Sequence, residues 1–133
     1  MREISVGTKG TAQIFVTPER TAKMVGSGML EVFATPCMAA LMEEAACACV
    51  APYLEEGEST VGTRLEITHV SATPVGMAVT AECVLTAAEG RKLTFSVTAR
   101  DDAGPIGSGT HDRFLIDTGR FMEKCRSKLK KGK

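Results

Sequence analysis

The sequence predicts an α+β fold in which an antiparallel β-sheet wraps around one long central helix. Residues 35–54 form one long and mostly apolar helical pattern. After residue 58 the chain alternates apolar and polar side chains with a period of two, as strands do. One earlier strand precedes the helix. Because these elements can share one core, and no repeat or linker interrupts them, we expect a single domain over residues 1–133.

The residues before the long helix predict a strand, a short helix and an irregular segment. The run AQIFVT at 12–17 is rich in β-branched residues and predicts a strand. Thr17 and Pro18 then supply an N-cap and a first-turn proline for a short helix that should end near Gly26. The irregular segment GSGMLEVFA at 26–34 is either a lid over a pocket or an ordinary connection.

The long helix should begin with Thr35 as its N-cap and Pro36 at its first position. Apolar or small residues surround it on nearly all sides, which indicates a buried helix. Glu44 lies well away from the centre of its apolar stripe, whereas Glu43 lies nearer the flank. A carboxylate on so apolar a helix needs a partner or a wet cleft. The apolar stripe consists of Met38, Leu41, Met42, Ala45 and Cys49.

Four strands are expected after the helix, over about 59–72, 77–87, 92–101 and 105–116. Glycine-containing turns at 88–90 and 101–104 predict hairpins between them. An amphipathic helix should follow from about Thr118. In the first of these strands the alternation predicts one face that carries Val61, Thr63, Leu65, Ile67 and His69, with Arg64, Glu66 and Thr68 opposite.

The charge balance gives no reason to expect nucleic acid or a membrane as a partner. Lys plus Arg and Asp plus Glu number 16 each among 133 residues. No apolar run is long enough to cross a bilayer and no signal sequence is evident, so we expect a cytoplasmic protein. The basic cluster at 126–133 is interpreted as a solvated end, with a phosphate or membrane contact as the alternative.

The five cysteines show no metal-site spacing, and we expect no metal site. An odd number of cysteines in a cytoplasmic protein indicates reduced thiols, which we expect to be mostly buried. A nucleophilic cysteine needs a nearby base and an exposed thiolate, and the sequence indicates neither.

Thr35, Glu43 and His69 are the candidate catalytic residues. A hydroxyl, a carboxylate and an imidazole suffice for acyl transfer to water. Glu43 could activate water or attack a carbonyl, His69 could move the proton or orient its partner, and the helix start at Thr35 suits a developing oxyanion. Each residue also has a structural explanation: a plain N-cap, a solvated or paired carboxylate, and a satisfied core histidine.

The spacing of these residues predicts a site shared between two chains. Eight helical residues separate Thr35 from Glu43 by about 12 Å, too far for direct cooperation along one straight helix. Two antiparallel helices in a dimer would close that gap, and a sheet of this kind has exposed edges that can pair. We therefore expect a homodimer in which each site combines Thr35 of one subunit with Glu43 of the other.

The stretch VFATPCMAALMEEAACACVAPYLEEGESTVGTRLEITHVSATPVG, with the later EGRKLTFSV and IGSGTHDR, resembles the fluoroacetyl-coenzyme A thioesterases of the hotdog superfamily. The resemblance covers nearly the whole chain. It implies the hotdog fold and hydrolysis of a short acyl-coenzyme A (acyl-CoA) thioester without a cofactor, coenzyme A being part of the substrate. It assigns catalysis to Thr35, Glu43 and His69, places Gly62 at the substrate carbonyl, and places Arg113 near the acyl or coenzyme A end.

The segment before Thr35 departs from the family pattern. The family carries phenylalanines in a lid that helps to select the fluorinated acyl group, and Phe33 fits this pattern. Gly28 and Met29, however, stand where another aromatic residue would be expected, so Met29 would contact the substrate in its place. Glu44 also replaces a bulky apolar residue. We therefore expect activity on an acyl-CoA whose acyl group the sequence leaves open.

Two other functions are compatible with the same fold. A non-catalytic module that binds acyl-CoA would keep the pocket and the dimer but would not need Glu43. A hydratase or dehydratase would use a histidine and an acid, but such enzymes normally carry the histidine on or near the central helix, which here has none. His111 follows the glycine-rich SGT of the last strand and is interpreted as structural.

Overall fold

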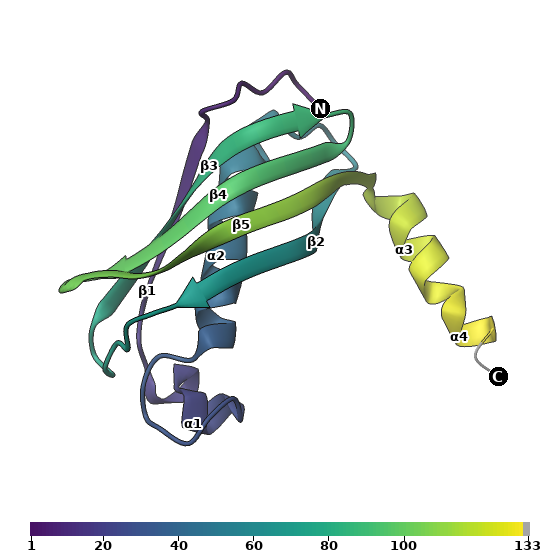
Figure 1. The fold of residues 1–133 in the computed structure, drawn as a ribbon. Helices are drawn as coiled ribbons and strands as arrows, with labels where there is room; N and C mark the ends of the chain where they lie inside the picture. The colour runs from purple at the N-terminus through teal and green to yellow at the C-terminus, as the bar shows by residue number, and fades with distance from the viewer. Residues whose placement is uncertain (132–133) are drawn as a thin grey trace.

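The computed structural model describes residues 1–131 and shows one antiparallel five-stranded sheet curled around one long helix (Figure 1). The order of the strands in the sheet is β1-β3-β4-β5-β2. The α+β hotdog prediction is therefore confirmed. The elements are β1 (Lys9–Phe15), a 3-10 turn (Pro18–Arg20), α1 (Ala22–Val25), α2 (Thr35–Val50), a second 3-10 turn (Ala51–Tyr53), β2 (Glu58–His69), β3 (Ala78–Glu89), β4 (Lys92–Asp101), β5 (Gly104–Asp117), α3 (Thr118–Arg126) and α4 (Lys128–Lys131).

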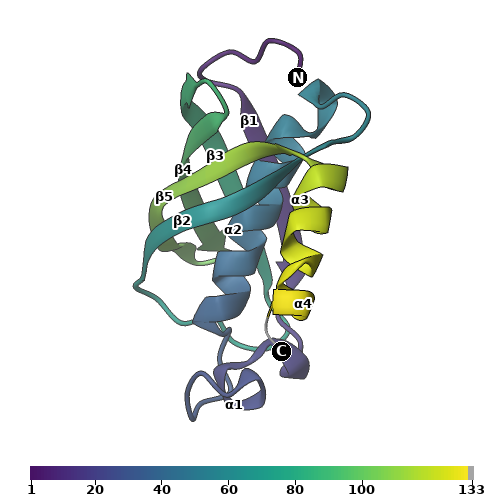
Figure 2. The same ribbon diagram turned by 90° about the vertical axis from the view of Figure 1, so that its right-hand side faces the viewer.

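The core lies between α2 and the concave face of the sheet (Figures 1 and 2). The apolar stripe predicted for the helix is buried, as are the apolar odd positions predicted for β3 and β4. The period of two in these strands therefore predicted their inward faces correctly. The buried strand residues include Val79, Ala81, Cys83, Leu85, Leu93, Phe95 and Val97.

The far side of α2 is exposed in the single chain, so the prediction of a helix buried all round is wrong. Pro36, Ala40, Glu44, Cys47 and Ala48 lie on this exposed side. The physical reason is that one curled sheet covers only one side of the helix (Figure 2). A stripe of small, mostly apolar side chains is therefore left without a protein neighbour.

The short helix predicted between Thr17 and Gly26 is broken in two. Thr21 is extended between the 3-10 turn and α1, where its hydroxyl donates to the Pro18 carbonyl at 2.8 Å and accepts from the Met24 amide at 3.3 Å. Thr21, and not Thr17, is therefore the N-cap of α1. Gly26 ends α1 in the left-handed conformation at φ 79°, as its position predicted.

A β-bulge between Gly62 and Arg64 corrects the predicted alternation of β2. Gly62 pairs with Arg113, but the next pairs are Arg64 with Asp112 and Leu65 with His111. The extra residue shifts the inward face from even to odd positions, because a bulge places two residues opposite one. Leu65 therefore shares the inward face with Gly62, and not with Val61 and Thr63 as expected.

The cysteines are free, as expected, but only Cys49 and Cys83 are buried, so the expectation that most would be buried is wrong. Burial raises the pKa of Cys83 to about 12 and also raises the pKa of Cys49. Both thiols therefore stay protonated and are poor nucleophiles. Cys47 and Cys125 are exposed on helices.

The C-terminal basic cluster is helical as far as the structure describes it, and its last two residues, 132 and 133, lie outside the described part of the chain. Helix α3 leaves the sheet beside the edge strand β2 (Figures 1 and 2). None of the helices in residues 1–131 is long and apolar enough to span a membrane.

Substituting Gly10 by alanine should destabilise the protein by about 2 kcal/mol or more, because α2 leaves no room for a side chain. A Cβ at this position would lie 2.6 Å from the Cys49 amide nitrogen and closer still to the Ala45 carbonyl oxygen. The matched control is Gly119→Ala on α3, where the nearest atom would be 3.6 Å away. Urea unfolding should show a large loss of stability for Gly10→Ala and none for Gly119→Ala. Equal midpoints for the two variants would contradict the close packing of β1 on α2.

Candidate active site

Thr35 and His69 meet at the start of α2 and the end of β2. The Thr35 Oγ1 atom lies 2.7 Å from His69 Nδ1. Thr35 is the first residue of the helix and Ala34 occupies the cap position, so the prediction of Thr35 as the N-cap is wrong. Its hydroxyl is directed to the imidazole instead of to a backbone amide. This pair is the first half of the candidate site.

The His69 imidazole is held in a mostly apolar environment. The ring of the buried Phe33 packs edge-on against it, with the ring centroids 6.4 Å apart at an interplanar angle of 79°. Burial lowers the pKa of His69 below its usual value, so the ring is neutral at pH 7. Within residues 1–131, His69 Nε2 is the buried side-chain nitrogen or oxygen that lacks a hydrogen-bond partner. Thr35 therefore engages the Nδ1 atom of His69, and the Nε2 atom has no hydrogen-bond partner in the described part of the chain.

The start of α2 offers fewer free amides than expected. The Cys37 and Met38 amides both donate to the Ala34 carbonyl at 3.0 Å, and Pro36 has no N–H group. For the Thr35 amide the described residues provide no acceptor. The positive end of the helix is present, but a single backbone N–H remains for an oxyanion.

Glu43 lies two turns further along α2 and faces Gly62 and Arg113. Its side chain is 42% exposed, and its Oε2 atom is 3.7 Å from Arg113 Nη1. A methyl group on Gly62 would lie 2.8 Å from the same oxygen, so the glycine leaves room for the carboxylate. At 3.7 Å the pair is electrostatic and longer than a hydrogen bond. The carboxylate therefore remains accessible at the surface of the single chain.

Arg113 is a buried cation fixed by neighbours on two strands. Its side chain is 7% exposed. The guanidinium donates to the hydroxyl and the carbonyl of Thr60, both at 2.9 Å, and lies 3.1 Å from His111 Nε2. Because the guanidinium can only donate, His111 Nε2 accepts and His111 Nδ1–H donates to the Arg64 carbonyl at 2.8 Å. This network holds one positive charge next to Glu43.

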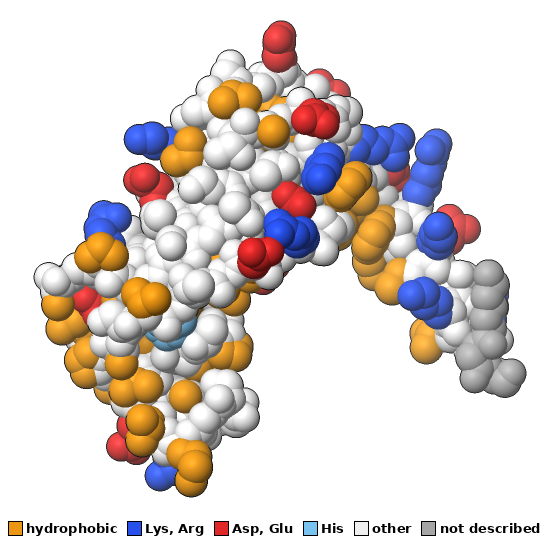
Figure 3. Space-filling model, in the orientation of Figure 1, with side chains coloured by type: hydrophobic (Ala, Val, Ile, Leu, Met, Phe, Trp, Pro, Cys, Tyr) orange, Lys and Arg blue, Asp and Glu red, His pale blue; other side chains and the backbone are white. Residues whose placement is uncertain are grey.

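The predicted site residues thus fall into two clusters in one chain. Thr35, His69 and Phe33 form one cluster, and Glu43, Gly62 and Arg113 form the other. About 12 Å of helix separates Thr35 from Glu43. Met29, predicted to contact substrate, lies in the segment before α2 and is 89% exposed. Figure 3 shows hydrophobic side chains gathered at this end of the molecule around a histidine.

Thr60 and His111 were not predicted to belong to the site. His111 was interpreted as structural, and its hydrogen bonds show that it supports Arg113. The spacing of His111 and Arg113 on one strand already places both on the same face. The predicted alternation counted the odd positions of β2 as inward and so placed Thr60 on the opposite face. The bulge after Gly62 makes the even positions before it the inward ones.

Replacing Arg113 by methionine should destabilise the protein by about 2 kcal/mol or more, because one buried and two partly buried acceptors lose their donor. Replacing Glu43 by glutamine should cost less than about 1 kcal/mol, since this half-exposed carboxylate makes only a long ion pair. Urea unfolding of the two variants measures the difference. A Glu43→Gln variant as unstable as Arg113→Met would show that the carboxylate is mainly structural.

Comparison with known proteins identifies the family. Residues 16–119 match the family described as fluoroacetyl-CoA-specific thioesterase. The fluoroacetyl-CoA thioesterase of Streptantibioticus cattleyicolor is 41% identical over 133 residues, with 96% of each chain covered. A crystal structure of a variant of the fluoroacetyl-CoA-specific thioesterase FlK superposes with a TM-score of 0.90 at 40% identity and covers 96% of this chain and 99% of that chain.

A second solved structure extends the similarity beyond that enzyme. A hypothetical protein of Thermus thermophilus, a thioesterase superfamily member, has a TM-score of 0.89 at 30% identity and covers 98% of this chain and 96% of its own. The family match spans most of the chain, and the curated relative covers nearly all of it. The chain therefore belongs to the fluoroacetyl-CoA-specific thioesterase family.

Proposed function

We propose that this protein hydrolyses short acyl-CoA thioesters to the free acid and coenzyme A, at sites that two copies of the chain build together. Each site takes Thr35 and His69 from one protomer and Glu43, Gly62 and Arg113 from its partner. The observation that carries the proposal is the division of the expected catalytic residues between two clusters of one chain. Membership of a thioesterase family supports the reaction.

Three features of the single chain support a shared site. His69 Nε2 is buried without a partner, which costs free energy unless another group reaches it. The exposed side of α2 carries the small residues Ala40, Cys47 and Ala48, which allow close approach of another helix. Strand β2 forms an edge of the sheet and can pair with a second β2. A two-fold axis beside β2 would bring antiparallel α2 helices together.

The chemistry follows from the character of each group. The Glu43 carboxylate can take a proton from water or attack the thioester carbonyl, and both routes produce a negative oxygen on that carbon. The Thr35 amide and the positive end of α2 can stabilise this oxygen. His69 is linked to Thr35 and can relay to the departing thiolate of coenzyme A the proton that Glu43 removes from water, so that the proton taken up with the water is released with the thiol. Arg113 keeps a fixed positive charge 3.7 Å from Glu43, which orients the carboxylate toward Gly62 and Arg113.

The size of the acyl group is expected to be small. Related structures of FlK are described as complexes with fluoroacetate and with acetyl-CoA. In this chain Phe33 is buried against His69, whereas Met29 is 89% exposed. Methionine is an unbranched and adaptable side chain, so a segment that presents Met29 suits several short acyl groups, and we propose short acyl-CoA thioesters as the substrate class.

Thiol release from acetyl-, fluoroacetyl-, propionyl- and aromatic acyl-CoA thioesters tests the proposal. Wild type should hydrolyse at least one of them, and Glu43→Ala and His69→Ala should each lower kcat/KM by a factor of about 100 or more, as loss of an acid–base group typically does. The matched control is Glu89→Ala, which removes an exposed carboxylate at the end of β3, away from the exposed side of α2, and should retain activity.

Two results would contradict this assignment. If wild type binds the thioesters but releases no thiol, the chain is a non-catalytic acyl-CoA-binding module and the Glu43–Arg113 pair is structural. If Glu43→Ala retains as much activity as Glu89→Ala, Glu43 is not the catalytic carboxylate. Circular dichroism of each variant shows whether a loss of activity follows from unfolding.

A further inference from the structure

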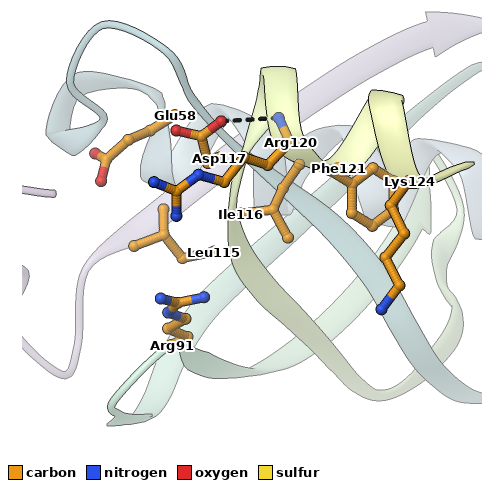
Figure 4. Close-up of a pocket in the computed structure, with 8 residues that line it drawn as sticks. All are labelled: Glu58, Arg91, Leu115, Ile116, Asp117, Arg120, Phe121 and Lys124. Carbon is orange, nitrogen blue, oxygen red and sulfur yellow. Dashed lines mark hydrogen bonds between the residues drawn. The ribbon is translucent and has the colours of Figure 1, made fainter.

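A cavity lies between the start of α3 and the adjacent ends of β2 and β5, apart from the Thr35–His69 pair (Figure 4). Its volume is about 410 Å³, within the usual range for small-molecule sites. Leu115, Ile116 and Phe121 give it an apolar floor, and the Phe121 side chain is 40% exposed. The cavity can therefore accept a flat ring.

Three cationic side chains surround this apolar floor. In Figure 4 the guanidinium groups of Arg91 and Arg120 lie on either side of Leu115, and Lys124 lies beyond Phe121. In the part of the chain that the structure describes, none of these three cations forms an ion pair within 4.0 Å. Their charges remain available to an anionic ligand with more than one charged group.

The two acidic residues of the cavity are already engaged. Glu58 binds the N-terminal ammonium at 2.8 Å and accepts from the Glu55 amide at 2.9 Å. Asp117 caps α3 by accepting from the Arg120 amide at 3.0 Å. Their carboxylates therefore offset the nearby cations only in part, and the cavity keeps a positive excess.

The cavity and the Glu43–Arg113 pair lie along the same two strands, β2 and β5. Leu115 follows Arg113 by two residues on β5 and pairs with Thr60 on β2, so all three face the same side of the sheet. Two residues of a strand span about 7 Å. An extended ligand whose thioester lies beside Glu43 and Gly62 can thus run along β2 and β5 into the cavity.

We infer that this cavity binds the 3′-phosphoadenosine diphosphate end of the coenzyme A thioester. This inference rests on the proposed function and adds the place where the nucleotide is recognised. Arg91 and Arg120 bind one phosphate group from two sides, Lys124 binds another, and the adenine ring stacks on Phe121. The acyl and nucleotide ends of one substrate are then held at separate places along β2 and β5.

The experiment compares wild type with the double variant Arg91→Ala/Arg120→Ala and the single variant Lys124→Ala. Wild type should bind adenosine 3′,5′-bisphosphate in a calorimetric titration, and both variants should bind it at least about 10-fold more weakly, because charge-assisted hydrogen bonds are lost. KM for acetyl-CoA should rise by a similar factor with kcat unchanged. With acetyl-pantetheine, which lacks the nucleotide, wild type and variants should behave alike.

Arg126→Ala is the matched control, because Arg126 is an exposed arginine of the same helix that does not line the cavity. Wild-type protein that fails to bind the bisphosphate would overturn the inference, as would variants that bind it with unchanged affinity. Equal rises in KM for acetyl-CoA and acetyl-pantetheine would also overturn it, since the residues would then act on the thioester end. The titration needs no turnover, so it tests whether the cavity binds the nucleotide even if the protein hydrolyses no thioester.

Discussion

The rise of an α-helix determines how the residues of the candidate active site are arranged. Thr35 and Glu43 stand on one straight helix about 12 Å apart, and no side-chain rotation can bring a hydroxyl and a carboxylate together over that distance. The sheet reinforces the separation, because His69 and Gly62 lie on the same strand and each faces a different part of α2. A single chain therefore holds two separate clusters, and the proposed function joins them through a second copy of the chain.

Arg113 gives the second cluster its rigidity. A buried guanidinium is costly unless its donors are satisfied, and here Thr60 and His111 accept from it on both sides. The result is a fixed positive charge under a carboxylate that remains partly exposed. The same strand pair, β2 and β5, continues to the basic cavity beside α3, so the Arg113 charge beside Glu43 and the charges suited to phosphates lie along one pair of strands.

Much of this structure could be predicted from the sequence, because the patterns that indicate its helix, strands and turns each lie within a short stretch of the chain. The buried stripe of α2, the inward faces of β3 and β4 and both hairpin turns follow from periodicity and glycine positions. The errors have equally local causes. A β-bulge after Gly62 shifts the inward face of β2 from even to odd positions. Ala34, and not Thr35, occupies the N-cap position of α2. The partners of Arg113 depend on pairing between distant strands, which periodicity does not reveal.

A heterodimer of two defective chains tests the shared site most directly. One chain carries Thr35→Ala and His69→Ala, the other carries Glu43→Ala, and different affinity tags allow the mixed dimer to be purified after co-expression. If each site draws on both chains, one site of the mixed dimer is intact and it should show about half the wild-type activity, whereas each parent alone is inactive. A mixed dimer as inactive as its parents would show that each site lies within one chain and would contradict the account.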